Sequence, residues 1–246
     1  MLNQPTEDKL HAMRLSAMAD AWLKQGQDPG LDELGFDERF AMIVDAEYIN
    51  RDNRRLERLL REAKLRIAAA CLEDVRTGQK HGLDKALVAQ LGTCRWLTEH
   101  LNVLVTGPTG VGKTYFACAL GQQACRRGYR TLYRRLPRLV EELTLARADG
   151  TYTRLLARLA RAQLLIIDDW GIVPMKDGPR RDLLEIMEDR YGVGSTVVTS
   201  QLPISKWHDY IGEPTVADAI LDRLVHSAYK CELKGASRRK ENAHKD

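Results

Sequence analysis

The sequence of 246 residues predicts an α/β fold in which a P-loop domain, with a parallel sheet flanked by helices, follows a small all-helical N-terminal domain. Beyond residue 100, short apolar runs alternate with longer segments of helical periodicity, which is typical of a parallel sheet. A glycine-rich motif follows the first apolar run, whereas the first 80 residues contain helical patterns only. We therefore expect a helical domain over residues 1–80 and the α/β domain over residues 81–246.

Composition narrows the class of protein. Hydrophobic residues make up 44% of the chain and charged residues 29%, as in an ordinary globular protein. No segment approaches the roughly 18 consecutive apolar residues of a membrane span, and the N-terminus lacks the basic start and apolar run of a signal peptide. The five cysteines include no CxxC pair and the six histidines are scattered. These features exclude membrane, secreted and zinc-module classes and predict a cytoplasmic protein, since unclustered cysteines suit a reducing compartment.

Helical periodicity predicts two helices in the N-terminal domain, over residues 9–24 and 37–75, separated by a glycine- and proline-containing loop over residues 25–34. Arginines recur on the second helix at steps of three, four and seven residues and therefore share one broad face; they are Arg51, Arg54, Arg55 and Arg58. This arginine stripe is suited to hold DNA, to pack on an acidic neighbouring subunit, or to contact a partner enzyme. We expect the N-terminal domain to serve DNA binding or oligomerisation.

The α/β domain is predicted to contain four strands, each an apolar run bounded by helix or turn signals. They cover residues 102–106, 130–134, 164–168 and 196–199. The helices between them are expected at residues 113–127, at 137–162 in one or two pieces, and at 180–191. Strands that alternate with helices form a parallel sheet through right-handed crossovers, and ligands of such sheets bind at the carboxyl ends of the strands.

A phosphate-binding loop follows the first predicted strand and matches the pattern GxxxxGK[ST] in full. Its residues are Gly107, Pro108, Thr109, Gly110, Val111, Gly112, Lys113 and Thr114. The glycines let backbone N–H groups surround a phosphate, the lysine neutralises the β and γ oxygens, and the threonine hydroxyl is placed to bind Mg²⁺. An apolar strand before the loop and a helix after it provide the context that this chemistry needs. The loop predicts binding of a nucleoside triphosphate.

Two acidic residues end the predicted strand over residues 164–168. Asp168 is suited to hold Mg²⁺ through water, as such acidic residues do in P-loop enzymes. Asp169 is suited to polarise the attacking water, because hydrolysis needs a general base near the γ-phosphate. The alternative for Asp169 is that it only caps the following turn.

Longer segments resemble a known family. They read NVLVTGPTGVGKTYFACALG, LLIIDDWG, VVTSQLP and AILDRLVHSAYKCELKGASRR, with FDERFAMIVDAEYINRDNRRLERLLREAKL nearer the N-terminus. The chain resembles the AAA+ ATPases of the clade that holds DnaC-type helicase loaders and DnaA-type initiators. Within that clade it resembles the IstB-like ATP-binding proteins of bacterial insertion sequences. The resemblance covers residues 8–240 and implies an AAA+ ATPase domain that uses ATP and Mg²⁺.

The resemblance also implies catalytic residues around the nucleotide. Gln201, or alternatively Ser200, takes the place of the γ-phosphate sensor, where the wider clade often has asparagine. The second acidic residue of AAA+ enzymes is usually glutamate, so the shorter Asp169 implies slower hydrolysis.

Arg223 resembles the arginine finger that reaches the ATP of a neighbouring subunit, an interaction worth roughly 10³–10⁵ in rate. The alternative for Arg223 is a surface ion pair with Asp222 or Asp218. Arg238 or Arg239 resembles a further nucleotide contact, and a basic tail is the alternative.

Charge is distributed unevenly, which points to a polyanionic partner. Residues 1–50 carry four Lys/Arg against ten Asp/Glu, whereas residues 126–161 carry ten arginines against three acidic residues. In related initiators this second region faces the channel of the oligomer, and its arginines are suited to phosphate contacts. No base-reading motif is visible, so we expect binding to duplex DNA with little sequence preference. The candidate DNA contacts here are Arg134, Arg135 and Arg138, and their alternative is pairing with Glu141, Glu142 and solvent.

The resemblance implies an ATP-dependent helper ATPase of transposition. We expect it to oligomerise on duplex target DNA with ATP at subunit interfaces, to remodel that DNA, and to deliver it to a partner transposase. A DnaC-like replicative helicase loader is the alternative, and it would prefer single strands. A small-molecule P-loop kinase would instead stay monomeric and need no arginine from a neighbour.

Overall fold

The computed structural model describes residues 4–31 and 33–237, and the chain divides into two compact units between Arg58 and Leu59. The second unit begins here rather than near residue 80. The physical reason is burial, because Ala70 and Val75 lie in the same apolar cluster as Leu91 of the α/β unit. No helix among the described residues is long and apolar enough to cross a membrane.

The first unit is helical. It contains α1 (Gln4–Ala12), α2 (Ser16–Gln25), the 3₁₀ turn η1 (Pro29–Leu31) and most of α3 (Phe36–Ala63), which ends in the second unit. Two sequence-based expectations are wrong here. The helix expected over residues 9–24 is two helices, because Arg14 has a φ of 61° and interrupts it. The helix expected to reach residue 75 ends at Ala63, because Lys64 also adopts the left-handed region, with a φ of 52°.

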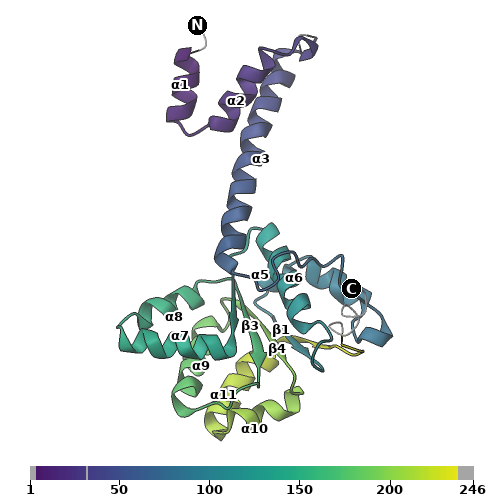
Figure 1. Ribbon diagram of the computed structural model, residues 1–246, viewed down its shortest axis with the longest axis vertical. Helices are drawn as coiled ribbons and strands as arrows, with labels where there is room; N and C mark the ends of the chain where they lie inside the picture. Colours follow the sequence, from purple (N-terminus) through teal and green to yellow (C-terminus); the bar gives the residue numbers. More distant parts are fainter. Residues whose placement is uncertain (1–3, 32, 238–246) are drawn as a thin grey trace, which may run out of the picture. The chain divides into compact units, whose positions relative to one another are not determined.

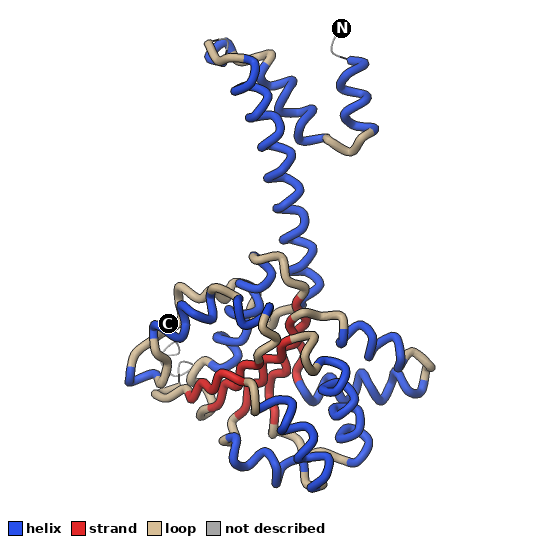
Figure 2. Tube along the Cα trace, turned by 180° about the vertical axis from the view of Figure 1, so that it is seen from behind, coloured by secondary structure: helices blue, strands red, loops and turns tan. Residues whose placement is uncertain are grey.

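The second unit contains a five-stranded sheet with the order β2-β3-β4-β1-β5, in which every neighbouring pair is parallel (Figures 1 and 2). The strands are β1 (Asn102–Thr106), β2 (Thr131–Arg135), β3 (Leu164–Trp170), β4 (Ser195–Ser200) and β5 (Ala228–Glu232). This confirms the predicted parallel sheet. The sequence did not predict β5, because it is an edge strand in which only Cys231 is buried.

Helices cover both faces of the sheet (Figure 1). The helices of this unit after α3 are α4 (Lys85–Gly92), α5 (Arg95–Thr98), α6 (Lys113–Arg126), α7 (Leu136–Ala148), α8 (Tyr152–Ala160), α9 (Asp177–Arg190), α10 (Trp207–Ile211) and α11 (Pro214–Val225), and the described residues also form 3₁₀ turns η2 (Gln79–His81) and η3 (Ile204–Lys206). In β1, Val103 and Val105 pack in one apolar cluster and Leu104 in the other. Successive side chains of a strand point to opposite faces, so this central strand is apolar throughout because both faces are buried.

The carboxyl ends of β1, β3 and β4 meet at one edge of the sheet. The register pairs Thr106 of β1 with Ser200 of β4, and the pairing of β3 with β4 is interrupted between Ile167 and Trp170. The phosphate loop, the acidic pair and the residues after β4 are therefore brought together. The interruption is an irregularity of the kind that re-aims side chains beside active sites, and here it falls on Asp168 and Asp169.

Candidate active site

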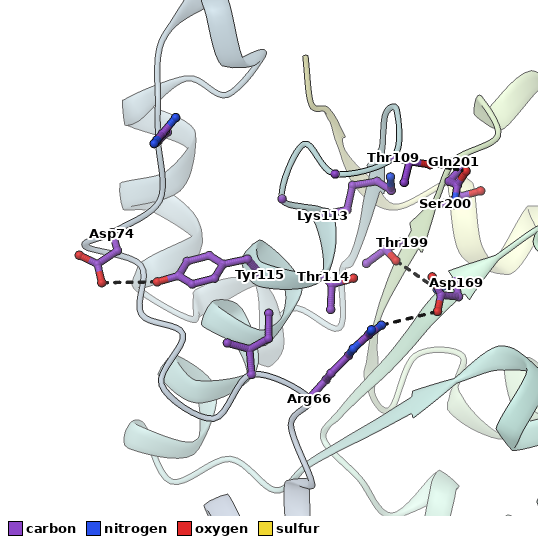
Figure 3. A pocket seen from close by; sticks show the side chains of 14 residues that line it. Arg66, Asp74, Thr109, Lys113, Thr114, Tyr115, Asp169, Thr199, Ser200 and Gln201 are labelled. Atoms are coloured by element: carbon purple, nitrogen blue, oxygen red, sulfur yellow. Dashed lines mark hydrogen bonds and ion pairs between the residues drawn. The ribbon is translucent and has the colours of Figure 1, made fainter. Parts of the chain in front are cut away.

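A cavity of about 440 Å³ opens at this edge of the sheet (Figure 3). It collects residues from four parts of the α/β unit: the segment after α3, the phosphate loop with the start of α6, the end of β3, and the end of β4. The lining residues are Arg66, Ile67, Asp74, Arg76, Thr109, Gly110, Gly112, Lys113, Thr114, Tyr115, Asp169, Thr199, Ser200 and Gln201.

The phosphate loop depends on glycine for its backbone. Gly107, Gly110 and Gly112 have φ values of 144°, 86° and 109°, which side-chain-bearing residues rarely adopt. Gly112 caps the N-terminus of α6, so the free N–H groups of the first helical turn face the cavity and favour an anion. Val111 is buried in the core and anchors the loop. Lys113 Nζ donates to the carbonyl oxygens of Gly107 and Pro108, both at 2.7 Å, and so lies across the loop.

Asp168 is fully buried and accepts hydrogen bonds from three side-chain hydroxyl groups. Thr114 Oγ1 lies 3.0 and 3.1 Å from its two carboxylate oxygens, and Tyr133 donates its hydroxyl at 2.6 Å. The hydroxyl of Thr199 donates to the other oxygen. Burial and the bond to Asp168 raise the pKa of Tyr133, so its phenol remains a donor. The Thr114 hydroxyl and the Asp168 carboxylate are hard oxygen ligands beside the phosphate loop, which fits a Mg²⁺ ion shared with a triphosphate.

Asp169 faces the cavity in an unusual backbone conformation, with a φ of 64°. Its Oδ2 accepts from Arg135 Nε at 2.6 Å, and Arg66 Nη1 lies 3.9 Å from carboxylate oxygens of both Asp168 and Asp169. The bond to Asp169 raises the pKa of the Arg135 guanidinium. Two arginines thus face this carboxylate, and its role as the general base stays a prediction.

Gln201 directly follows β4 and lies beside Thr109 (Figure 3), and it accepts a hydrogen bond from Thr109 Oγ1 at 2.7 Å. Ser200, the alternative sensor, is fully buried and donates to the carbonyl oxygen of Trp170 at 2.8 Å. Gln201 is therefore the residue of the two whose side chain extends to the phosphate loop. Its role as a γ-phosphate sensor stays a prediction.

Arg223 is absent from the residues that line this cavity. It lies on α11, where its Nη2 is 3.0 Å from Glu188 and its Nη1 donates to the carbonyl oxygen of Ala219 at 2.8 Å. It lines a separate cavity of about 220 Å³ with Asn102, at the opposite, amino end of the strands. The ion pair expected with Asp222 or Asp218 is instead made with Glu188.

The candidate DNA arginines fall into different environments. Arg134 is only 7% exposed and donates a hydrogen bond to Glu142 at 2.9 Å. Its burial excludes Arg134 as a DNA contact. Arg135 pairs with Asp169, while Arg138 is exposed on α7. On α3, Arg51 is exposed and pairs with Glu47 at 2.8 Å, and Arg54, Arg55 and Arg58 are exposed. Arg238 and Arg239 lie outside the described residues.

Sequence reasoning missed one wall of the cavity. Arg66 and Asp74 come from a segment that the sequence assigns to the helix over residues 37–75 but that is mostly loop, and Arg76 directly follows it. Tyr115 donates its hydroxyl to Asp74 at 3.4 Å and links this wall to α6. No local pattern in the sequence marks these residues, because Arg66 reaches the cavity through the turn of the chain at Lys64.

The fold and the site together define a P-loop ATPase of the AAA+ class. A family model described as IstB-like ATP binding protein matches residues 8–246. The chain is 48% identical to a putative insertion sequence ATP-binding protein of Sinorhizobium fredii, and the match covers 100% of both chains. It is 49% identical to the insertion sequence IS1162 putative ATP-binding protein of Pseudomonas fluorescens, over 83% of this chain and 89% of that protein. The chain belongs to the family of IstB-like ATP binding proteins.

Solved structures with the same fold include AMPPCP-bound DnaA from Aquifex aeolicus, with a TM-score of 0.57 and 20% identity over 72% of this chain and 54% of that chain. The DnaC helicase loader gives a TM-score of 0.56 and 19% identity, over 67% of this chain and 97% of the loader. At these identities the similarity shows a shared fold, which agrees with the predicted clade.

Proposed function

We propose that this ATPase is a helper of transposition that oligomerises on duplex target DNA, remodels it and delivers it to a partner transposase. The observation that carries the proposal is the cavity that joins a complete phosphate loop to Asp168 and Asp169, in a chain whose relatives are named insertion sequence ATP-binding proteins. The cavity accounts for ATP hydrolysis, and the relatives point to the process that uses it.

The residues of the cavity have separate roles in ATP hydrolysis. Lys113 leaves the loop carbonyls for the β and γ oxygens of ATP, where the N-terminus of α6 adds its free N–H groups. Thr114 and Asp168 would hold Mg²⁺, which neutralises charge on the same oxygens. Asp169 accepts a proton from the attacking water, and the Gln201 amide orients that water beside the γ-phosphate.

Assembly follows from the position of Arg223. Because Arg223 lies at the amino end of the strands and the nucleotide cavity at their carboxyl end, Arg223 cannot serve its own cavity. A head-to-tail contact between copies brings the two together, so ATP favours an oligomer. Exposed arginines on α3 and α7 supply positive charge for DNA phosphates.

Sedimentation tests the proposal most directly. We expect a large complex when the protein is mixed with random-sequence duplex DNA and a non-hydrolysable ATP analogue, and no such complex without the analogue. Lys113→Ala should abolish it, because the triphosphate loses its principal cation. A complex that forms only on single-stranded DNA would favour a helicase loader, and a monomer under every condition would contradict the assembly model.

Substitutions of two neighbouring arginines distinguish an effect on DNA binding from an effect on folding. We expect Arg138→Ala to weaken duplex binding and to reduce the slope of log affinity against log salt by about one, as loss of a phosphate contact does. Arg134→Ala should instead lower the free energy of unfolding by about 1–3 kcal/mol, because the buried carbonyl oxygen of Tyr133 loses its donor. Fluorescence anisotropy across a salt series and thermal unfolding measure the two effects. An Arg138→Ala protein with unchanged affinity would remove α7 from the DNA interface.

A further inference from the structure

A short segment that follows α3 forms one wall of the nucleotide cavity. Helix α3 ends at Ala63, and Lys64 adopts a φ of 52°, so the chain turns at this point. Leu65 packs against the core of the α/β unit and lies over Gly121 of α6, where a Cβ atom would stand 2.9 Å from it. The backbone that carries Arg66 is therefore held beside the helix that follows the phosphate loop.

The side chain of Arg66 enters the cavity from this wall (Figure 3). Its Nη1 atom lies 3.9 Å from carboxylate oxygens of Asp168 and Asp169, which is longer than a hydrogen bond. Arg135 holds Asp169 much more closely, at 2.6 Å. The side chain of Arg66 is also 43% exposed. Its attraction to the acidic pair is therefore weak, because water screens a partly exposed pair that no hydrogen bond holds together.

A bound triphosphate changes the balance of charge around Arg66. Thr114 and Asp168 would hold Mg²⁺, and a carboxylate that faces the metal attracts Arg66 less strongly. The phosphates meanwhile bring new negative charge into the cavity. Because the planar guanidinium matches two phosphate oxygens at once, Arg66 gains more from a phosphate than it loses at the acidic pair.

The position of Arg66 favours the last phosphate of ATP. The free N–H groups of the phosphate loop and the start of α6 are suited to the phosphates nearer the nucleoside. Arg66 instead faces the end of β3, where Asp169 is assigned to the water that attacks the γ-phosphate. A guanidinium at this place meets the γ-phosphate of ATP and has no corresponding phosphate to meet in ADP.

We propose that Arg66 binds the γ-phosphate of ATP within its own subunit, and that this contact makes the protein bind ATP more tightly than ADP. The inference rests on the proposed function for the place of ATP in this cavity, and it needs neither DNA nor a second subunit. Arg66 thus differs from Arg223, which lines the separate cavity at the amino end of the strands. Hydrolysis removes the phosphate that Arg66 binds and so lowers the affinity for the product.

The test is equilibrium binding of AMPPCP and of ADP to the full chain in the presence of Mg²⁺, measured by titration calorimetry. The wild-type protein should bind AMPPCP more tightly than ADP. Arg66→Ala should weaken AMPPCP by about tenfold, the lower end of what a hydrogen bond to a charged group contributes, and ADP by less than about twofold. Arg66→Lys keeps the charge without the planar fork and should recover part of the loss. The ratio of the two dissociation constants decides, because a purely structural defect weakens both nucleotides alike.

Arg126→Ala is the matched control. Arg126 on α6 is 46% exposed and lies 3.9 Å from Glu73, so it makes an ion pair of the same length between α6 and the segment after α3. It is not among the described residues that line the cavity. Both dissociation constants should therefore stay at their wild-type values. Thermal unfolding verifies that each variant is folded, and Arg66→Gln carries the test if the alanine variant is not.

Three results would overturn the inference. Equal weakening of both nucleotides by Arg66→Ala would show that Arg66 shapes the cavity without contacting the γ-phosphate. Unchanged binding of both would show that Arg66 does not contact the nucleotide, and a wild-type protein with equal affinity for AMPPCP and ADP would have no selectivity for Arg66 to supply. A wild-type protein that binds neither nucleotide contradicts the proposed function as well. Failure to assemble on DNA, with the selectivity for ATP intact, contradicts the proposed function alone.

Discussion

Replacement of Arg223 by alanine is expected to lower ATP hydrolysis in the assembled protein by roughly 10³-fold, the lower end of what an arginine finger contributes. The loss should appear in kcat, because the arginine acts on charge that develops on the transferred phosphate. The folded subunit should be nearly unaffected. The ion pair with Glu188 is partly exposed, and pairs of that kind contribute about 0–1 kcal/mol to the free energy of unfolding.

Glu188→Gln is the matched control for this variant. It removes the same ion pair from the other side and leaves the guanidinium in place, so hydrolysis should stay near the wild-type rate. If Glu188→Gln loses as much activity as Arg223→Ala, the pair itself matters and the arginine does not act on a neighbour's ATP.

Mixing variants tests whether Arg223 acts between subunits. In a mixture of equal amounts of Arg223→Ala and Asp169→Asn, an interface is intact when the first variant supplies the cavity and the second supplies the arginine. Random head-to-tail assembly places about a quarter of the interfaces in that state. Activity should therefore return to about a quarter of the wild-type value, although each variant alone is inactive. A mixture with no recovered activity would place Arg223 outside the neighbour's site.

The sequence predicted the parts of the site that depend on local pattern. The phosphate loop needs glycines at fixed positions, and the acidic pair ends an apolar strand, so both can be read without a structure. The parallel sheet follows in the same way from apolar runs that alternate with helices.

The rest of the site depends on contacts between distant segments. Arg66 reaches the acidic pair only because α3 ends at Ala63 and the chain turns at Lys64, where no glycine marks the break. Arg134 and Arg135 are adjacent in a basic segment, yet one is buried and the other pairs with Asp169. Strand alternation predicts that they face opposite ways, but it cannot say which carboxylate each will meet.

The substitution of Asp169 by asparagine is expected to reduce kcat by roughly 10²–10⁴, the usual contribution of a general base. Asparagine has nearly the same shape as aspartate but cannot accept a proton at neutral pH. ATP binding should remain, because Lys113, Thr114 and Asp168 are unchanged. The variant should then form the DNA-bound assembly with ATP itself and dissociate from it slowly, since hydrolysis no longer loosens the interface.

Asp169→Asn also breaks the ion pair with Arg135, so Arg135→Ala is the matched control. Both variants lose the pair, but only Asp169→Asn loses the carboxylate, so a loss of kcat that both variants share would come from the pair and not from the base. Single-turnover hydrolysis and the lifetime of the DNA complex measure the effect. Hydrolysis by Asp169→Asn at the wild-type rate would contradict the assignment of the base. The water would then have to be activated by another group, and among the described residues that line the cavity Asp74 carries the other carboxylate.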